Sequence, residues 1–263
     1  MRLFLPSPVH AATEQADVEA ALERFRAFES HVPKLLRRLQ PWLPLAPGAP
    51  VLDLGAAQGS AVAAFRRAGL DASGIEPWAP AIRVGAELGR RIGVELELTE
   101  GVGEALPYAA DSFDLVHADS VLEHVTDPVA VFREAYRVLR PSGGFFFSTT
   151  SVLCPRQHEI SWFVLFPWYP PRLQRAIMDW AKENRPALVG NTTMPAYHWF
   201  SHRWVRRILR AVGFREIVDR WDLRRDDERD GLRGAALQAA RSIRILRLAG
   251  DVVVPGMEYL ARK

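Results

Sequence analysis

Short apolar runs alternate with amphipathic stretches along the first 150 residues of the chain. The run VLDL at 51–54 is typical of a strand that is buried on both faces of a sheet. Similar patterns predict strands at 70–75, 94–98, 112–118 and 143–150, with helices at 61–68, 79–92 and 128–139 between them. Strands and helices in this order form a parallel sheet with right-handed crossovers and helices on both faces. We therefore predict an α/β fold built on a doubly wound, mostly parallel sheet.

Prolines, glycines and changes of pattern divide the chain into four predicted parts. These are a helical cap at 1–49, a core at 50–150, an α-rich lid insertion at 151–200, and a C-terminal part of the core at 201–263. The cap contains a predicted amphipathic helix at 13–40, interrupted near Pro33. The C-terminal part contains a second predicted amphipathic helix at 232–249, inserted before a last strand at 257–262.

The composition narrows the class of protein. The 263 residues are 48% hydrophobic, as in an ordinary globular protein, and this length buries a core without disulfides. Cys154 is the single cysteine, so an internal disulfide is ruled out. No apolar run reaches the ~20 residues of a membrane span. The first residues, MRLFLPSPVH, are too short and too rich in proline for a signal peptide, so a cytoplasmic location is expected.

The two halves of the chain carry opposite charge. Residues 1–150 contain 14 Lys+Arg and 19 Asp+Glu, a net charge of −5. Residues 151–263 contain 20 and 12, a net charge of +8. The basic half suits an anionic substrate, a membrane surface or nucleic acid, or serves only to keep the surface solvated. The sequence carries no recognised nucleic-acid-binding module, so we expect no nucleic-acid partner.

Candidate binding residues follow the first two predicted strands. The first strand leads into a turn with Gly55 and Gly59, and a helix begins directly after it. Glycines let the backbone approach a ligand closely, and a helix N-terminus presents free N–H groups. Glu76 ends the second strand, 21 residues after Gly55. Because an acid at this place can accept hydrogen bonds from two ribose hydroxyls, the pattern indicates a nucleoside-binding unit.

Four segments together resemble a known family. They are VLDLGAAQG at 51–59, GEALPYAADSFDLVHADSVLEHVTDP at 103–128, VLRPSGGFFFSTT at 138–150 and HWFSHRWVRRILRAVGF at 198–214. The chain resembles the class I S-adenosylmethionine-dependent methyltransferases of the small-molecule type. The resemblance implies a seven-stranded Rossmann-like sheet, S-adenosylmethionine as the cofactor and S-adenosylhomocysteine as its product.

The resemblance also implies where the cofactor binds. The implied cofactor-binding residues are Asp53, Gly55, Ala57, Gly59, Glu76, Pro77, Trp78, Gly103, Glu104 and Asp119. In this assignment Asp53 and the glycine turn surround the amino-acid part of the cofactor, Glu76 holds the ribose, and Asp119 reaches the amino group. Trp78 flanks the adenine, since an aromatic face stacks well on a base.

The chain departs from the family pattern at two positions. Ala57 replaces the second glycine of the turn and adds a methyl group where the backbone nears the ligand. Val102 stands where many members carry an acid that binds adenine. Glu104 is two places away from that position, which leaves backbone groups to hold the base. A non-methylating, cofactor-binding scaffold is therefore a further alternative.

The lid insertion is expected to select the methyl acceptor. Residues 151–200 contain nine aromatic residues and six prolines, a pattern typical of lids and binding loops. We expect a small acceptor that is apolar and ring-bearing or prenylated. The segment from Trp162 to Trp168 and the helix at 232–249 also motivate an alternative, a methyltransferase that works at a membrane surface on a lipid or polyprenyl acceptor.

An acceptor with a hydroxyl group or an acidic carbon needs a general base. Histidine suits this role, and His124 and His198 are the first candidates, followed by His158 and Tyr197. His10 and His31 are set aside because they lie outside the predicted strand-end face. Asp119 and Glu123 alone do not make an octahedral site, so we predict no metal. The sequence leaves open whether oxygen, nitrogen or carbon is methylated, and the oligomeric state.

Overall fold

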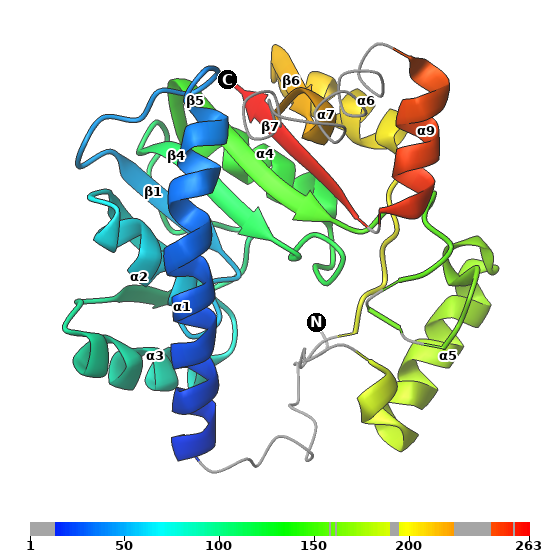
Figure 1. Cartoon of the computed structure of the whole chain (residues 1–263), viewed down its shortest axis with the longest axis horizontal. Helices are drawn as coiled ribbons and strands as arrows, with labels where there is room; N and C mark the ends of the chain where they lie inside the picture. The colour runs from blue at the N-terminus through cyan, green and yellow to red at the C-terminus, as the bar shows by residue number, and fades with distance from the viewer. Residues whose placement is uncertain (1–13, 158, 161, 190–194, 224–242, 255) are drawn as a thin grey trace, which may run out of the picture.

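The computed structural model describes residues 14–157, 159–160, 162–189, 195–223, 243–254 and 256–263 (Figure 1). Its centre is a seven-stranded sheet with the order β3-β2-β1-β4-β5-β7-β6. The strands are β1 (Pro50–Leu54), β2 (Asp71–Glu76), β3 (Glu97–Glu100), β4 (Phe113–Asp119), β5 (Leu139–Thr149), β6 (Glu216–Asp219) and β7 (Met257–Arg262). Strands β1 to β5 pair in parallel, and β7 is antiparallel to β5 and β6. The predicted fold class is confirmed.

The described helices lie on both faces of this sheet, except α5 (Pro171–Asn184), which belongs to the region after β5. They are α1 (Glu14–Leu39), α2 (Ser60–Arg67), α3 (Ala79–Ile92), α4 (Pro128–Val138), α5 (Pro171–Asn184), α6 (His202–Val212), α7 (Arg220–Leu223) and α9 (Arg244–Val253). Helix α1 contacts α2 and α3 on one face, and α4 contacts α6 on the other (Figure 1). The two faces of the sheet therefore bury separate apolar clusters.

The pleat of β1 decides which of its side chains face each cluster. Val51 belongs to the cluster under α1 and α2, whereas Leu52 and Leu54 belong to the cluster under α4 and α6. Because successive side chains of a strand point to opposite faces, Asp53 lies on the α1 face. An acidic side chain is thus buried among apolar residues at the centre of the sheet.

Local sequence signals explain several helix ends. Asp127 accepts hydrogen bonds from the backbone N–H groups of Val129 and Ala130 at the start of α4. Ser201 accepts one from Trp204 at the start of α6. Such caps satisfy donors that have no partner within a helix. Helix α3 matches its prediction, and it ends at Gly93, whose φ of 66° favours glycine.

Three predicted boundaries were wrong. Helix α1 runs unbroken through Pro33, because the apolar stripe on either side packs against one continuous surface. Strand β3 begins at Glu97 rather than at residue 94, since Val94 still bonds to the last turn of α3. Strand β5 begins at Leu139, before Pro141, and the ladder shifts register there between Phe113 and Leu115.

The region after β5 packs on a small apolar core of its own. Ile160, Phe166, Met178, Ala181 and Ala196 form this cluster. The region contains α5 and two 3-10 turns, η2 (Phe166–Trp168) and η3 (Pro186–Leu188), and Figure 1 shows α5 standing apart from the sheet. The predicted α-rich insertion is therefore present after the fifth strand.

The predicted helix at 232–249 is tested only in part. Residues 232–242 lie outside the described part of the chain, whereas α9 covers 244–249 and continues to Val253. The predicted last strand at 257–262 is confirmed as β7. Among the described helices, none combines the length and the apolar character that crossing a membrane requires.

Candidate active site

The turn after β1 brings the backbone close to the carboxyl ends of the strands. Gly55 and Gly59 have φ values of 67° and 75°, in the region that favours glycine. A Cβ atom at Gly55 would lie 2.6 Å from Cγ2 of Val121, in the loop after β4. Ala57 adopts a φ of 48° without being glycine. The turn therefore leaves no room for a side chain at 55, and helix α2 begins directly after it.

Glu76 ends β2 and faces this turn. Its Oε2 accepts a hydrogen bond from the N–H of Ala57 at 2.9 Å, and its Oε1 accepts one from Trp78 at 3.1 Å. Burial raises the pKa of Glu76, and these two N–H groups oppose that rise. A carboxylate has about four acceptor positions, so two remain for a ligand. Glu76 is thus fixed in place and can still accept two hydroxyl groups.

Asp53 forms a buried pair with His117 on the neighbouring strand β4. His117 Nδ1 lies 2.6 Å from Asp53 Oδ1, and the residues are 3% and 4% exposed. Burial raises the pKa of Asp53. Burial also lowers the pKa of His117, but the hydrogen bond and charge of Asp53 outweigh it, so the net shift is upward. Each shift favours the protonated form of its group.

The remaining predicted cofactor residues surround the same strand ends. Asp119 ends β4, and its carboxylate accepts a hydrogen bond from Ser148 on β5. Glu104 instead accepts bonds from the N–H groups of Thr126 and Asp127, at 2.8 and 3.3 Å. These bonds hold the Glu104 carboxylate against the loop before α4, and the residue lies two positions from the place of the adenine-binding acid in the family. Pro77 and Gly103 lie in the loops after β2 and β3.

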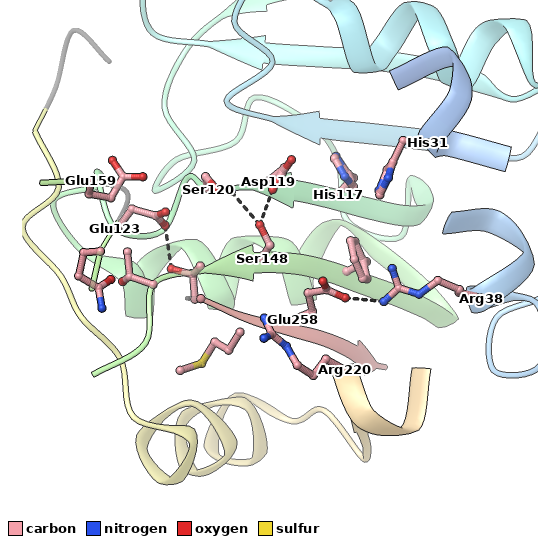
Figure 2. A pocket seen from close by; sticks show the side chains of 16 residues that line it. His31, Arg38, His117, Asp119, Ser120, Glu123, Ser148, Glu159, Arg220 and Glu258 are labelled. Carbon is pink, nitrogen blue, oxygen red and sulfur yellow. Dashed lines mark hydrogen bonds and ion pairs between the residues drawn. The ribbon is translucent and has the colours of Figure 1, made fainter. Parts of the chain in front are cut away.

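A cavity of about 250 Å³ opens beside these strand ends (Figure 2). Its described lining residues come from α1, β4 and the loop after it, β5 and the region after it, α7, and β7 with the residue before it. They are His31, Arg38, His117, Asp119, Ser120, Glu123, Phe146, Ser148, Thr149, Thr150, Gln157, Glu159, Arg220, Gly256, Met257 and Glu258. Asp119 and His117 connect this cavity with the turn after β1.

Glu123 is the most deeply buried acid of the cavity, at 1% exposure. Its Oε2 accepts a hydrogen bond from Thr149 Oγ1 at 2.7 Å. Burial raises the pKa of Glu123 to about 8, the Thr149 bond opposes the rise, and the charges of Glu159 and Asp119 add to it. Its ionised form, which prevails above about pH 8, is a stronger base than an ordinary carboxylate and can accept the proton of a bound hydroxyl group.

The three described base candidates, His124, Tyr197 and His198, lie around Glu123, but the described cavity lining does not include them. The backbone N–H groups of Tyr197 and His198 donate to the carbonyl oxygen of Glu123. His198 Nε2 bonds to the carbonyl of Val125 at 2.9 Å, and Tyr197 donates its hydroxyl to Asp179 at 2.7 Å. His158 lies outside the described residues. Their roles stay predictions, and their described contacts are structural.

His31 corrects one expectation from the sequence. It was set aside as lying away from the strand-end face, yet it lines the cavity with Arg38, from the same helix. The cause is the continuous helix α1, which packs along one face of the sheet and carries both residues to the cavity. Arg220 and Glu258 were also missed, because they follow β6 and begin β7, where no local motif marks them. Only their position in the folded chain brings them together.

One group of side chains could supply metal ligands. Atoms of Glu123, His124 and Glu159 lie within 4.8 Å of one another, and His124 Nε2 is 3.6 Å from Glu159 Oε2. Three donors are half of the six that octahedral Mg²⁺ requires, so water would have to complete the shell. The prediction of no metal stays a prediction, and this group is where a metal assay should look.

Comparison with known families and structures identifies the central part of the chain. Residues 52–147 match the family described as "Methyltransferase domain". This segment runs from β1 into β5 and includes the turn, Glu76, the Asp53–His117 pair and Glu123. The family match therefore coincides with the part of the fold that positions the candidate site.

Among curated relatives, a ubiquinone biosynthesis O-methyltransferase from Methylobacterium sp. (strain 4-46) is 29% identical over 191 residues, 67% of this chain and 74% of the relative. A protein of the same name from Ralstonia nicotianae is 35% identical over 126 residues, covering 48% of this chain and 52% of the relative. The chain thus spans about half to three quarters of the length of these two relatives.

Solved structures share the fold. The YcgJ protein from Bacillus subtilis superposes with a TM-score of 0.55 at 16% identity, covering 88% of this chain and 98% of that protein. Phosphoethanolamine N-methyltransferase 2 from Haemonchus contortus, solved with S-adenosyl-L-methionine, has a TM-score of 0.56 at 16% identity, covering 88% and 52%. At 16% sequence identity, this structural similarity establishes the fold alone.

The raised pKa of Glu123 predicts a pH-dependent stability. The folded protein holds the proton of Glu123 up to about pH 8, whereas the unfolded chain releases it near the ordinary value of 4.5. This stabilisation is complete below pH 4.5 and is lost as the pH rises through about 8. The free energy of unfolding of Glu123→Gln, taken relative to that of the wild type, should therefore increase by about 2–5 kcal/mol from pH 5 to pH 9.

Chemical unfolding of both proteins at pH 5 and pH 9 measures this gain. Glu95→Gln, at an exposed position before β3, is the matched control and should show no gain. If the difference in the free energy of unfolding between Glu123→Gln and the wild type is equal at the two pH values, the raised pKa of Glu123 is contradicted.

Proposed function

We propose that the chain, whose residues 52–147 match a methyltransferase domain, is a class I S-adenosylmethionine-dependent methyltransferase and that it methylates a small, ring-bearing acceptor with an apolar body. The observation that carries this proposal is the cavity at the ends of β4 and β5, which shares Asp119 with the predicted cofactor residues. We propose a cytoplasmic enzyme, in keeping with the single, buried Cys154.

The residues at the strand ends fit the cofactor. Glu76 keeps two acceptor positions for the two ribose hydroxyls. Gly55 and Gly59 carry no side chain, so the backbone of the turn leaves room for the amino-acid part to approach. Trp78 follows Glu76 and offers an aromatic face for the adenine. Val102 is exposed at the end of β3 and offers an apolar contact in place of an acid.

An oxygen acceptor is the form of the proposal that Glu123 supports best. The two curated relatives described above are named O-methyltransferases, and a hydroxyl acceptor must lose a proton to become a good nucleophile. Glu123 lies in the cavity wall with a pKa near the working pH, as a general base requires. Phe146 and Met257 give the same wall an apolar surface for the acceptor ring.

The proposed mechanism assigns the proton transfer to Glu123. When bound, S-adenosylmethionine supplies an electrophilic methyl group on a positively charged sulfur. Glu123 takes the hydroxyl proton as the acceptor oxygen forms its bond to the methyl group, and the electron pair of the broken carbon–sulfur bond stays on sulfur. Thr149 holds the carboxylate in place, and the cavity walls align the acceptor, which supplies much of the acceleration.

This mechanism predicts a pH profile set by Glu123. Methyl transfer to a catechol, followed with methyl-labelled cofactor, should rise about tenfold per pH unit and level off above about pH 8, because the base must be ionised. Glu123→Gln should lower the rate by roughly 10²–10⁴-fold and remove this midpoint.

Glu159→Gln is the matched variant for this profile. The Glu159 charge raises the pKa of Glu123 by repulsion, so its removal should move the midpoint below pH 8 and keep the plateau rate. A profile that is the same in wild type and Glu123→Gln would exclude Glu123 as the base.

A membrane-surface acceptor is the second candidate, and exposed apolar side chains favour it. The region after β5 and α9 expose the large apolar residues Trp162, Val164, Leu165, Trp168, Leu173, Trp180, Ile243, Ile245, Leu246, Leu248, Val252 and Val253. Trp162 is 88% exposed, which is unusual for tryptophan in a soluble surface. Apolar side chains of this kind, on a half of the chain with a net positive charge, suit the interface of an anionic membrane.

Vesicle flotation tests the second candidate. At low salt the protein should float with vesicles that contain 30 mol% phosphatidylglycerol and not with pure phosphatidylcholine, because both apolar insertion and charge attraction contribute. Trp162→Ser combined with Ile245→Ser should lower the bound fraction severalfold. Equal flotation of this variant and the wild type, or no flotation of either, would rule out this surface.

A further inference from the structure

Two acidic side chains lie where the amino-acid part of the cofactor is expected to bind. Asp53 is 4% exposed, and its Oδ1 lies 2.6 Å from Nδ1 of His117. Asp119 ends β4, where it is exposed and lines the cavity. A positively charged amino group binds best to a carboxylate that the ligand can reach. Of these two acids, Asp119 is therefore the one that a bound amino group can meet.

Ser148 on β5 holds the carboxylate of Asp119. The two residues are register partners in the ladder between β4 and β5. The hydroxyl group of Ser148 donates a hydrogen bond to Oδ1 of Asp119 (Figure 2). This bond occupies one of the roughly four acceptor positions of a carboxylate, and a bond to an ionised acceptor is stronger than a neutral one. Ser148 thus fixes the direction of an exposed acid and leaves acceptor positions for a ligand.

Ser148 also holds the turn that follows Asp119. Its hydroxyl oxygen accepts a hydrogen bond from the backbone N–H of Ser120 at 3.2 Å, and its carbonyl oxygen accepts one from the same N–H, also at 3.2 Å. Ser120 has a φ of 56°, a backbone conformation that is strained in a residue other than glycine. Because the carbonyl belongs to the backbone, removal of the hydroxyl group leaves the turn one of its two bonds and releases the Asp119 carboxylate.

The turn after β4 packs against the glycine turn after β1. Val121 follows Ser120, and its Cγ2 lies 2.6 Å from the place that a Cβ atom at Gly55 would take. Asp119 is therefore held two residues before a direct contact with the backbone that the amino-acid part of the cofactor is expected to approach. The hydroxyl group of Ser148 reaches this region through the side chain of Asp119.

The next residue of β5 carries its hydroxyl group to a different carboxylate. Successive side chains of a strand point to opposite faces of the sheet. Ser148 accordingly binds Asp119, whereas Thr149 Oγ1 donates to Glu123 Oε2 at 2.7 Å. Thr149 therefore provides a matched control, because it has the same kind of donor at the same strand end but a carboxylate partner on the acceptor side of the site.

We propose that Ser148 is a positioning residue of the cofactor site, whose hydroxyl group holds the Asp119 carboxylate where it pairs with the amino group of S-adenosylmethionine. Because Asp119 meets the cofactor only under the proposed function, this role of Ser148 rests on that function. Ser148 acts through Asp119 and does not contact the reacting atoms. It adds a residue of β5 to a cofactor site that the sequence places on β1, β2, β4 and the loops after β2 and β3.

Calorimetric titration with S-adenosylhomocysteine tests this role. Ser148→Ala should weaken binding about tenfold, the effect expected when one charge-assisted contact loses its fixed geometry. Ser148→Thr keeps the hydroxyl group and should bind within about twofold of the wild type. Thr149→Val keeps the shape of the neighbouring side chain, removes its hydroxyl group and should also bind as the wild type does. Wild-type affinity in Ser148→Ala, or an equal loss in Thr149→Val, overturns the proposal.

A double-mutant cycle shows whether Ser148 acts through Asp119. In the Asp119→Ala background, Ser148→Ala should change the affinity for S-adenosylhomocysteine by less than about twofold, because the carboxylate that it positions is gone. 5′-Methylthioadenosine lacks the amino-acid part of the cofactor and should bind the wild type and Ser148→Ala equally. A tenfold loss that persists in the Asp119→Ala background, or that extends to 5′-methylthioadenosine, overturns the assignment.

The wild-type titration separates this role of Ser148 from the proposed function. Wild-type protein that binds S-adenosylhomocysteine as tightly as Ser148→Ala does refutes the role of Ser148 and leaves the proposed methyl transfer standing. Wild-type protein that is folded but does not bind S-adenosylhomocysteine refutes the proposed function itself. Circular dichroism shows that each variant is folded before its affinity is compared. If Ser148→Ala does not fold, Ser148→Cys takes its place, since a thiol of similar size is a weaker donor and should give a smaller loss of the same kind.

Discussion

The buried hydrogen bond between Asp53 and His117 connects the two halves of the candidate site. It crosses from β1 to β4 at the centre of the sheet, where the order of the strands reverses direction. Phe65 and Phe146 pack against the imidazole at 5.2 and 5.8 Å between ring centroids. A buried charge without its partner would cost several kcal/mol, so each residue requires the other. The pair thereby fixes β1, which leads into the glycine turn, against β4, which leads to Asp119 and Glu123.

Much of the fold could be predicted because its signals are local. The run VLDL, the glycines at 55 and 59 and the acid at 76 each reflect backbone geometry within one β-α-β unit, and the structure places them as that unit requires. The alternation of strands and helices along the chain then predicted the parallel sheet. The cofactor side of the site follows from these short-range patterns, and Glu76 is held at the turn by the N–H groups of its neighbours.

The acceptor side of the site depends on contacts between distant segments, and the sequence did not reveal it. His31 and Arg38 reach the cavity because α1 continues through Pro33, against the usual effect of proline in a helix. Arg220 and Glu258 meet them from the far end of the chain. The role of Glu123 depends on its burial, which only the packing of Thr149 and the 195–200 segment creates. The aromatic residues that led to an apolar acceptor belong largely to the separate core after β5, and the cavity itself is strongly charged.

The central claim is that Glu76 and the glycine turn form a working cofactor site despite Ala57 and Val102. Calorimetric titration of the purified protein with S-adenosylmethionine and S-adenosylhomocysteine tests it most directly. We expect micromolar binding that is lost in Glu76→Ala, because two hydrogen bonds from ribose hydroxyls to a carboxylate are removed. Glu95→Ala, which removes an exposed acid just before β3, should bind as the wild type does. Folded wild-type protein that binds neither compound, or Glu76→Ala that binds as tightly as the wild type, would contradict the claim.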